Sequence, residues 1–186
     1  MKTAWLLHGT GGSNTDYFWF ADTKQFLEAN GYDVWWPLLP NTDNPNLAET
    51  SSFISANMPA PNEDTIIIGH SSACPVIMYL LQYAKTPVKQ VILVAGFYQA
   101  IGDEGASDAM LPDGGFDWAA IKAAAKEIIL INSDNDPWGC DAAQAQPVAK
   151  ELGAQFVLAA GQGHMGSHTY DQPYKEFPKL KALLAV

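Results

Sequence analysis

The sequence predicts an α/β fold, a three-layer α/β/α sandwich built on a mostly parallel six-stranded sheet. Short apolar runs alternate with longer helical patterns along the chain. Most of the runs are continuously apolar, which is typical of parallel strands that helices cover on both faces. A chain of 186 residues with 48% hydrophobic and 16% charged residues suits one globular domain, expected to span residues 1–186.

Each expected element rests on a local pattern. A glycine at position 31 is a plausible end for the first helix, and Gly153 ends a later one. Pro178 is expected to bend or delay the last helix. The strands are expected at 4–7, 33–36, 65–68, 90–95, 127–131 and 155–159. The helices are expected at 19–30, 47–58, 71–84, 118–126, 141–152 and 174–184.

Strands and helices in this alternation form a doubly wound sheet with right-handed crossovers. Ligands of such sheets bind at the carboxyl ends of the strands. The longest stretch without clear periodicity is 96–116, which we expect to be either a mobile loop over the site or a surface connection. No insertion is long enough for a separate lid domain, so the expected core is compact.

Charge and cysteine usage exclude several classes of function. The net charge of −10, with 10 Lys and Arg, disfavours binding to nucleic acid or to an anionic membrane. The two cysteines, Cys74 and Cys140, suit a reducing compartment and form no Cys/His cluster typical of zinc. The first residues lack the pattern of a signal peptide. We therefore expect a cytoplasmic protein that uses neither metal nor cofactor.

A candidate nucleophile follows the third expected strand. Gly69-His70-Ser71-Ser72-Ala73 matches the G-x-S-x-G elbow, with Ala73 at the last position where glycine is usual. Such an elbow holds serine on a strained turn between strand and helix, so its Oγ projects from the top of the sheet. The next backbone N–H and the helix N-terminus face the charge that develops during acyl transfer.

A serine nucleophile needs a base, and the base needs an orienting acid. The chain order Ser, Asp, His of the elbow-containing hydrolases is met by Ser71, Asp136 and His164. His164 is preferred to His168 because it lies nearer the preceding strand, between flexible glycines. Asp136 is preferred to Asp134 because the proline that follows fixes its turn, whereas Asp134 is expected to cap that turn.

The loop after the first expected strand, His8-Gly9-Thr10-Gly11-Gly12-Ser13-Asn14, is the expected second half of an oxyanion hole. Its N–H donor is expected to be Thr10, with Gly11 as second choice, opposite the N–H of Ser72. The competing interpretation is a nucleotide-binding loop. The third glycine of G-x-G-x-x-G and the Walker lysine are both missing, which disfavours that interpretation.

Other chemical side chains have weaker expected roles. His8 and His70 are expected to be structural, Cys74 a small buried apolar residue, and Cys140 reactive only if exposed. The residues expected to line a substrate pocket are Tyr17, Trp19, Trp138 and Met165, although core packing competes with this role.

These motifs together resemble the small serine hydrolases related to retinoblastoma-binding protein 9, a compact branch of the α/β-hydrolase superfamily. The resemblance covers nearly the whole chain. It rests on the glycine-rich segment 8–13 with the aromatic segment 16–20, on 69–72, on 133–137 and on 163–164. It implies a core without a lid and the triad Ser71, Asp136 and His164. Ala73, in place of the usual glycine, is the one departure from the family pattern. The resemblance does not identify a substrate.

Two functions remain open from the sequence. The first is a serine hydrolase, most simply an esterase, acting on a small carboxylic ester or a related acyl compound. The second is a non-catalytic binding or scaffold protein on the same fold, because fold does not decide function. An esterase, thioesterase, amidase or peptidase would use the same triad, so the leaving group stays open, as does the choice between monomer and homodimer.

Overall fold

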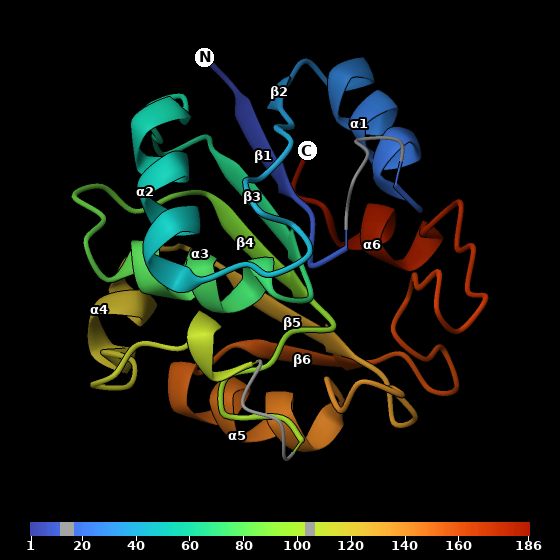
Figure 1. The fold of residues 1–186 in the computed structure, drawn as a ribbon. Helices are drawn as coiled ribbons and strands as arrows, with labels where there is room; N and C mark the ends of the chain where they lie inside the picture. Colours follow the sequence, from blue (N-terminus) through green and yellow to red (C-terminus); the bar gives the residue numbers. More distant parts are fainter. Residues whose placement is uncertain (12–16, 103–106) are drawn as a thin grey trace.

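A computed structural model describes residues 1–11, 17–102 and 107–186. Its centre is a six-stranded sheet in the order β2-β1-β3-β4-β5-β6, with every neighbouring pair parallel. The expected α/β class and three-layer sandwich are confirmed, and the sheet is wholly rather than mostly parallel (Figure 1). The strands are β1 (Thr3–Leu7), β2 (Asp33–Trp35), β3 (Ile66–His70), β4 (Gln90–Val94), β5 (Ile128–Asn132) and β6 (Gln155–Leu158).

The helices divide between the two faces of the sheet. The chain leaves β1 toward β2 and then crosses back to β3, so right-handed crossovers place α1 on one face and the later crossover helices on the other. α6 lies on the same face as α1 (Figure 1). Lys181 of α6 and Asp22 of α1 form an ion pair with an N–O distance of 2.8 Å. The helices are α1 (Phe20–Ala29), α2 (Leu47–Asn57), α3 (Ala73–Leu81), α4 (Trp118–Ala123), α5 (Ala142–Leu152) and α6 (Pro178–Leu183).

The change of direction creates a topological switch point between β1 and β3. Parallel sheets bind ligands in the crevice at the carboxyl ends of the strands on either side of such a point. The four central strands, β1, β3, β4 and β5, are buried at every residue, which explains their continuously apolar sequences. The elbow follows β3 and the expected oxyanion loop follows β1, so the fold brings both to one crevice.

Several boundaries differ from expectation for local reasons. β3 runs on through Gly69 and His70, and α3 begins only at Ala73, because Ser71 takes a left-handed conformation that no helix continues. The last helix begins at Pro178 rather than at 174, since proline lacks an N–H and is favoured in the first helical turn. α4 ends at Ala123, three residues before the expected end at 126.

The long connection 96–116 contains a short 3-10 helix, η1 (Asp108–Met110), rather than unbroken loop. Residues 103–106 of this connection, expected to be either a mobile loop or a surface connection, lie outside the described residues. So do residues 12–16 of the glycine-rich and aromatic segments. Within the described ranges, none of the helices combines the length and the apolar character that a membrane span would need.

Candidate active site

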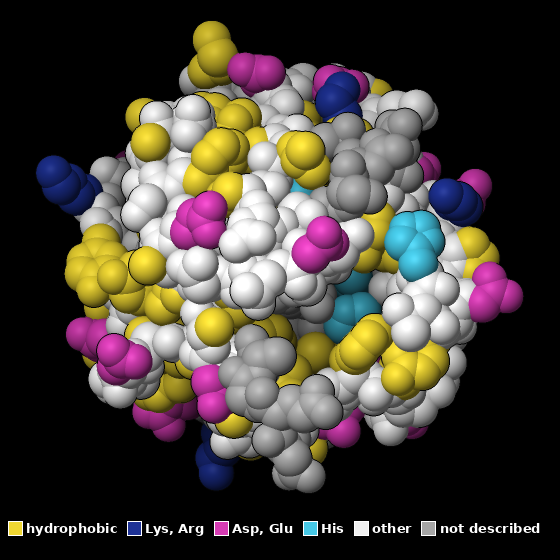
Figure 2. Space-filling view, viewed as in Figure 1, with side chains coloured by type: hydrophobic (Ala, Val, Ile, Leu, Met, Phe, Trp, Pro, Cys, Tyr) yellow, Lys and Arg dark blue, Asp and Glu magenta, His cyan; other side chains and the backbone are white. Residues whose placement is uncertain are grey.

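A cavity of about 420 Å³ lies at the carboxyl ends of the strands, and Ser71 and His164 both line it. Its walls include residues that follow each of the six strands, from Thr10 after β1 to His168 after β6. Figure 2 shows the molecule hollowed on this face, with histidine side chains in the depth of the hollow. The cavity therefore occupies the position where a doubly wound sheet binds its ligands.

Ser71 sits on the strained turn that the elbow motif predicts. Its φ is +55°, a left-handed value that costs a residue with a side chain about 1–3 kcal/mol. The Ser71 N–H donates to the Val94 carbonyl at 2.9 Å, and the Cys74 N–H donates to the Ser71 carbonyl at 2.9 Å. These bonds join the turn to β4 and to α3, and they keep Ser71 in its left-handed conformation.

Gly9 permits the oxyanion loop to approach the elbow closely. A Cβ at this position would lie 2.6 Å from Ser71 Cβ and 3.1 Å from the carbonyl oxygen of His70. Both distances are below ordinary van der Waals contact, and the second involves backbone that cannot rotate away. A residue with a side chain at position 9 would therefore push the loop and the nucleophile apart.

We expect Gly9→Ala to lower kcat for ester hydrolysis by about 10²-fold, because small displacements of a reacting group are costly. Overpacking should also lower the free energy of unfolding by about 1–3 kcal/mol. Kinetics with p-nitrophenyl esters and urea titration measure the two effects. Gly114→Ala is the matched control, since nothing lies within 4 Å of a Cβ there. Wild-type kinetics in Gly9→Ala would contradict the tight approach.

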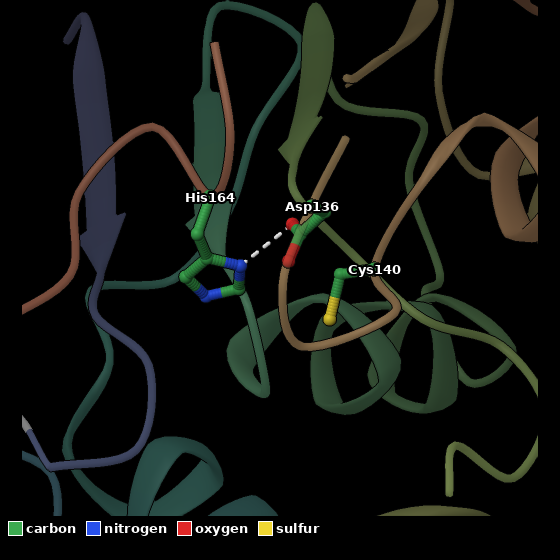
Figure 3. A group of neighbouring side chains, drawn as sticks. All are labelled: Asp136, Cys140 and His164. Atoms are coloured by element: carbon green, nitrogen blue, oxygen red, sulfur yellow. Dashed lines mark hydrogen bonds and ion pairs between the residues drawn. The ribbon is translucent and has the colours of Figure 1, made fainter. Parts of the chain in front are cut away.

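His164 and Asp136 form a buried acid–base pair. The His164 Nδ1–H donates to Asp136 Oδ2 at 2.7 Å, and the carboxylate side chain is fully buried (Figure 3). The second carboxylate oxygen, Oδ1, accepts from the Trp138 N–H at 2.8 Å. This leaves His164 Nε2 as the nitrogen that can accept a proton, because Nδ1 is used by the carboxylate.

Side chains of neighbouring loops fix the backbone around His164. Gly163 has φ +57° and donates its N–H to Asn135 Oδ1 at 2.8 Å. The His164 N–H donates to Gln172 Oε1 at 2.9 Å. Asp134 accepts from the Gly161 N–H at 2.7 Å, so it ties the acid loop to the base loop rather than capping its own turn as expected. Asn135 and Gln172 were not foreseen, since only the folded loops bring them to this segment.

The expected oxyanion donors lie where the β1 loop meets the elbow. The Thr10 hydroxyl donates to Ser72 Oγ at 2.8 Å, which joins the two segments. Within the described ranges, neither the Thr10 N–H nor the Ser72 N–H donates to a protein acceptor. The Gly11 N–H already donates to the Thr42 carbonyl at 2.8 Å, so this second choice is the poorer donor for a substrate.

Of the two hydrogen bonds of the expected triad, the described residues form the one between His164 and Asp136. Among the described residues, Ser71 Oγ and the His164 ring form no hydrogen bond, although both line the cavity. Catalytic hydrogen bonds of this kind often tighten only when substrate binds. The arrangement can thus supply a nucleophile, a base oriented by a carboxylate, and free backbone donors at one cavity.

Cys140 lies beside the acid–base pair. Its Sγ, a carboxylate oxygen of Asp136 and a ring nitrogen of His164 all lie within 4.8 Å of one another (Figure 3). Burial, with the negative charge of Asp136 next in importance, raises the pKa of the Cys140 thiol well above its usual value. A metal ion prefers a thiolate, and His164 Nδ1 is already bonded to Asp136, so the three groups suit a metal poorly.

Two of the four expected pocket residues line the cavity. Tyr17 and Trp138 do, whereas Trp19 and Met165 are fully buried away from it, which corrects that expectation. The Trp19 indole N–H donates to the Met165 carbonyl at 2.9 Å, so both belong to packing beneath the site. The cavity walls that the sequence did not assign include Asp43, Phe97, Ile101, Met110, Cys140 and His168.

The two remaining buried histidines are structural, as expected. The His70 Nε2–H donates to the His164 carbonyl at 2.9 Å, and His8 Nε2 accepts from the Leu39 N–H at 3.0 Å. Burial, followed by the nearby His164, lowers the pKa of His70 to about 3. Burial also lowers the pKa of His8. Both side chains are therefore uncharged in the folded protein near neutral pH.

This lowered pKa predicts a loss of stability in acid. Between pH 6.5 and about 3 the unfolded chain binds a proton on His70 that the folded chain excludes. The free energy of unfolding should therefore fall as the pH drops below 6.5, by up to about 1.4 kcal/mol per pH unit for this one group. His70→Gln, which retains a donor for the His164 carbonyl, should reduce that slope.

Urea unfolding at several pH values between 7 and 4.5 measures the slope. His168→Gln is the matched control, because it removes an exposed histidine and leaves His70 in place. Some slope should persist in His70→Gln, since burial of His8 acts in the same direction. Equal slopes in His70→Gln and the wild type would show that His70 does not exclude the proton.

Comparison with known proteins gives consistent results. The family model described as serine hydrolase matches residues 4–186. The YdeN protein of Bacillus subtilis (strain 168), which bears the name of a hydrolase, is 28% identical over 171 residues, covering 90% of this chain and 85% of YdeN. The crystal structure of the B. subtilis ydeN gene product superimposes with a TM-score of 0.89 at 23% identity, covering 98% of this chain and 96% of that one.

A more distant solved structure has the same fold. A CIB-like hydrolase from Thermoplasma acidophilum superimposes with a TM-score of 0.66 at 20% identity, covering 98% of this chain and 87% of that chain. At this level of identity the likeness concerns the fold alone. The expected compact α/β-hydrolase core is thereby confirmed.

Proposed function

Because the chain belongs to the serine hydrolase family, we propose that it hydrolyses small carboxylic esters or related acyl compounds through Ser71, His164 and Asp136. The observation that carries this proposal is the buried 2.7 Å hydrogen bond between His164 Nδ1 and Asp136, made at the cavity that Ser71 also lines. A carboxylate bonded to Nδ1 orients the imidazole so that Nε2 can act as base.

The proposed reaction has two stages. Ser71 Oγ attacks the acyl carbon as its proton passes to His164 Nε2, and the protonated imidazole then returns the proton to the leaving group. Water, deprotonated by the same imidazole, releases the acyl group from Ser71. Asp136 stabilises the imidazolium, and the N–H groups of Thr10 and Ser72 stabilise the negative oxygen of the tetrahedral intermediate.

Three observations bear on where and on what this hydrolase acts. The cavity of about 420 Å³ suits a small substrate, and an ester is the simplest one, since it needs no special activation of the leaving group. Both cysteines are free thiols, which fits a reducing compartment such as the cytoplasm. The excess of acidic side chains argues against nucleic acid and anionic membranes as partners.

A binding protein without catalytic activity is the second candidate. It is favoured by the missing hydrogen bond between Ser71 and His164 within the described residues. The strained φ of Ser71 weighs against it, because a turn that costs free energy is expected to be lost where no chemistry needs it.

Labelling with a fluorophosphonate probe tests the proposal directly. The probe phosphonylates an activated serine, so we expect stoichiometric modification of folded protein, mapped by peptide mass to Ser71. Ser52→Ala, which changes an exposed serine of α2, should label as well as the wild type. Folded protein that neither reacts with the probe nor hydrolyses p-nitrophenyl esters would contradict the hydrolase and favour the binding protein.

A further inference from the structure

The described residues that line the cavity include an acidic side chain but no basic one. None of the described residues that line it is a lysine or an arginine, and Asp43 places a carboxylate at its exposed rim. The whole chain contains no arginine, since its 10 basic residues are all lysines. The guanidinium group that most often binds a substrate carboxylate or phosphate in two places is therefore missing from this protein.

The lysines lie elsewhere, and several are already paired. Lys24 pairs with Glu28, and Lys126 pairs with Glu63 at 2.9 Å. In Figure 2 the lysine side chains stand at the margin of the face, and acidic side chains stand both at that margin and nearer the hollow. No lysine of the described ranges is thus placed to neutralise an anionic substrate in the cavity.

The sequence also fixes the charges of the segments outside the described residues. Residues 12–16, which come just before Tyr17, contain Asp16, and residues 103–106 contain Asp103 and Glu104. Neither segment contains a lysine.

Aromatic side chains complete the walls. Tyr17, Phe97 and Trp138 line the cavity, and the Trp138 ring meets the Tyr170 ring edge-on with a centroid distance of 5.1 Å. Burial raises the pKa of Tyr17 to about 12, so its ring is present as the neutral phenol. The faces of such rings attract cations, by about 0.5–2 kcal/mol for each well-placed pair.

We propose that the natural substrate of this site is an ester that carries a positively charged alkylammonium group, and that the site discriminates against esters bearing a carboxylate. This inference rests on the proposed hydrolase activity. A carboxylate entering the cavity would lose hydration without gaining a cationic partner, which is costly. An ammonium group would meet a carboxylate at the rim and aromatic walls inside, and negative charge around a cleft concentrates cations there.

Three esters with one leaving group test the inference. They are p-nitrophenyl hexanoate, the mono-p-nitrophenyl ester of adipic acid, and p-nitrophenyl 6-(trimethylammonio)hexanoate, assayed at pH 8, where histidine carries little charge. At about 10 mM ionic strength we expect kcat/KM to rank cationic, then neutral, then anionic, with at least a tenfold ratio between the extremes. That ratio should shrink at 1 M NaCl, where the Debye length is about 3 Å.

A charge reversal at the cavity rim tests whether Asp43 causes the preference for the cationic ester. Asp43→Lys should lower the cationic-to-anionic ratio at least threefold, whereas Asp64→Lys should leave it unchanged. Asp64 is also exposed but lies just before β3, at the amino ends of the strands and so at the opposite end of the sheet from the cavity. An unchanged ratio in Asp43→Lys would overturn the assignment to charge at the cavity.

The three substrates separate the two proposals. Hydrolysis of the neutral ester with equal kcat/KM for the charged esters at low ionic strength would overturn the inference and leave the hydrolase intact. A preference for the anionic ester would overturn it as well. Absence of hydrolysis of all three esters, the neutral one included, would overturn the proposed hydrolase and the inference with it.

Discussion

Ser71→Ala is expected to lower kcat for p-nitrophenyl ester hydrolysis by about 10⁴–10⁶-fold, because no other group can form the acyl intermediate. Residual hydrolysis should come from substrate binding and from the N–H groups of Thr10 and Ser72. Active-site titration with a fluorophosphonate, followed by steady-state kinetics, measures both the lost nucleophile and the remaining rate.

The variant should still fold, so its inactivity can be interpreted. Alanine at φ +55° bears much the same strain as serine, and the backbone bonds of residue 71 to Val94 and Cys74 do not involve the hydroxyl. The free energy of unfolding should change by less than about 1 kcal/mol. Ser52→Ala, at an exposed serine of α2, is the control and should retain the wild-type rate. Activity in Ser71→Ala within tenfold of the wild type would move the nucleophile to another residue.

Asp136→Asn is expected to lower kcat by about 10³–10⁴-fold with little change in fold. The amide has the size of the carboxylate, and its oxygen can still accept from the Trp138 N–H. Its NH₂ group, however, would face His164 Nδ1 and favour the tautomer with the proton on Nε2, which cannot accept a proton from Ser71. Steady-state kinetics and urea unfolding of the same preparation separate catalysis from stability.

Asp134→Asn is the matched control for the acid. Asp134 bonds the Gly161 N–H rather than the histidine, and an asparagine oxygen can make the same bond. Its kcat should stay within a few-fold of the wild type. If the two variants behaved in the opposite way, the acid would be Asp134, and the bond between Asp136 and His164 would have no part in catalysis.

The sequence predicted the fold because its pattern depends mainly on burial. Runs such as Ile66–Ile68 are apolar on both faces, and only a parallel sheet between helix layers buries both. It also predicted that Ser71, Asp136 and His164 lie near one another, because each follows a strand of one parallel sheet. The predicted element boundaries were wrong where the conformation of a single residue sets the start of a helix, as at Ser71 and Pro178.

The directions of side chains could not be predicted in the same way. Trp19 lies two residues after Tyr17, yet Trp19 is fully buried away from the cavity, whereas Tyr17 lines it. Asp43 reaches the cavity because the chain after β2 turns back across the end of β1. The Pro, Asn and Asp residues at 40–45 predict a turn but not its direction. Asn135 and Gln172 depend likewise on how two loops meet.

The bond between His70 and the His164 carbonyl has a consequence for synthesis of the protein. It joins residues 94 positions apart, and α6, farther along still, fastens to α1 through Lys181 and Asp22. In the proposed mechanism, a nascent chain on the ribosome therefore carries its nucleophile long before the base that would activate it. We expect the unfinished polypeptide to leave esters intact, and hydrolysis to begin only once translation has delivered β6 and the loop after it.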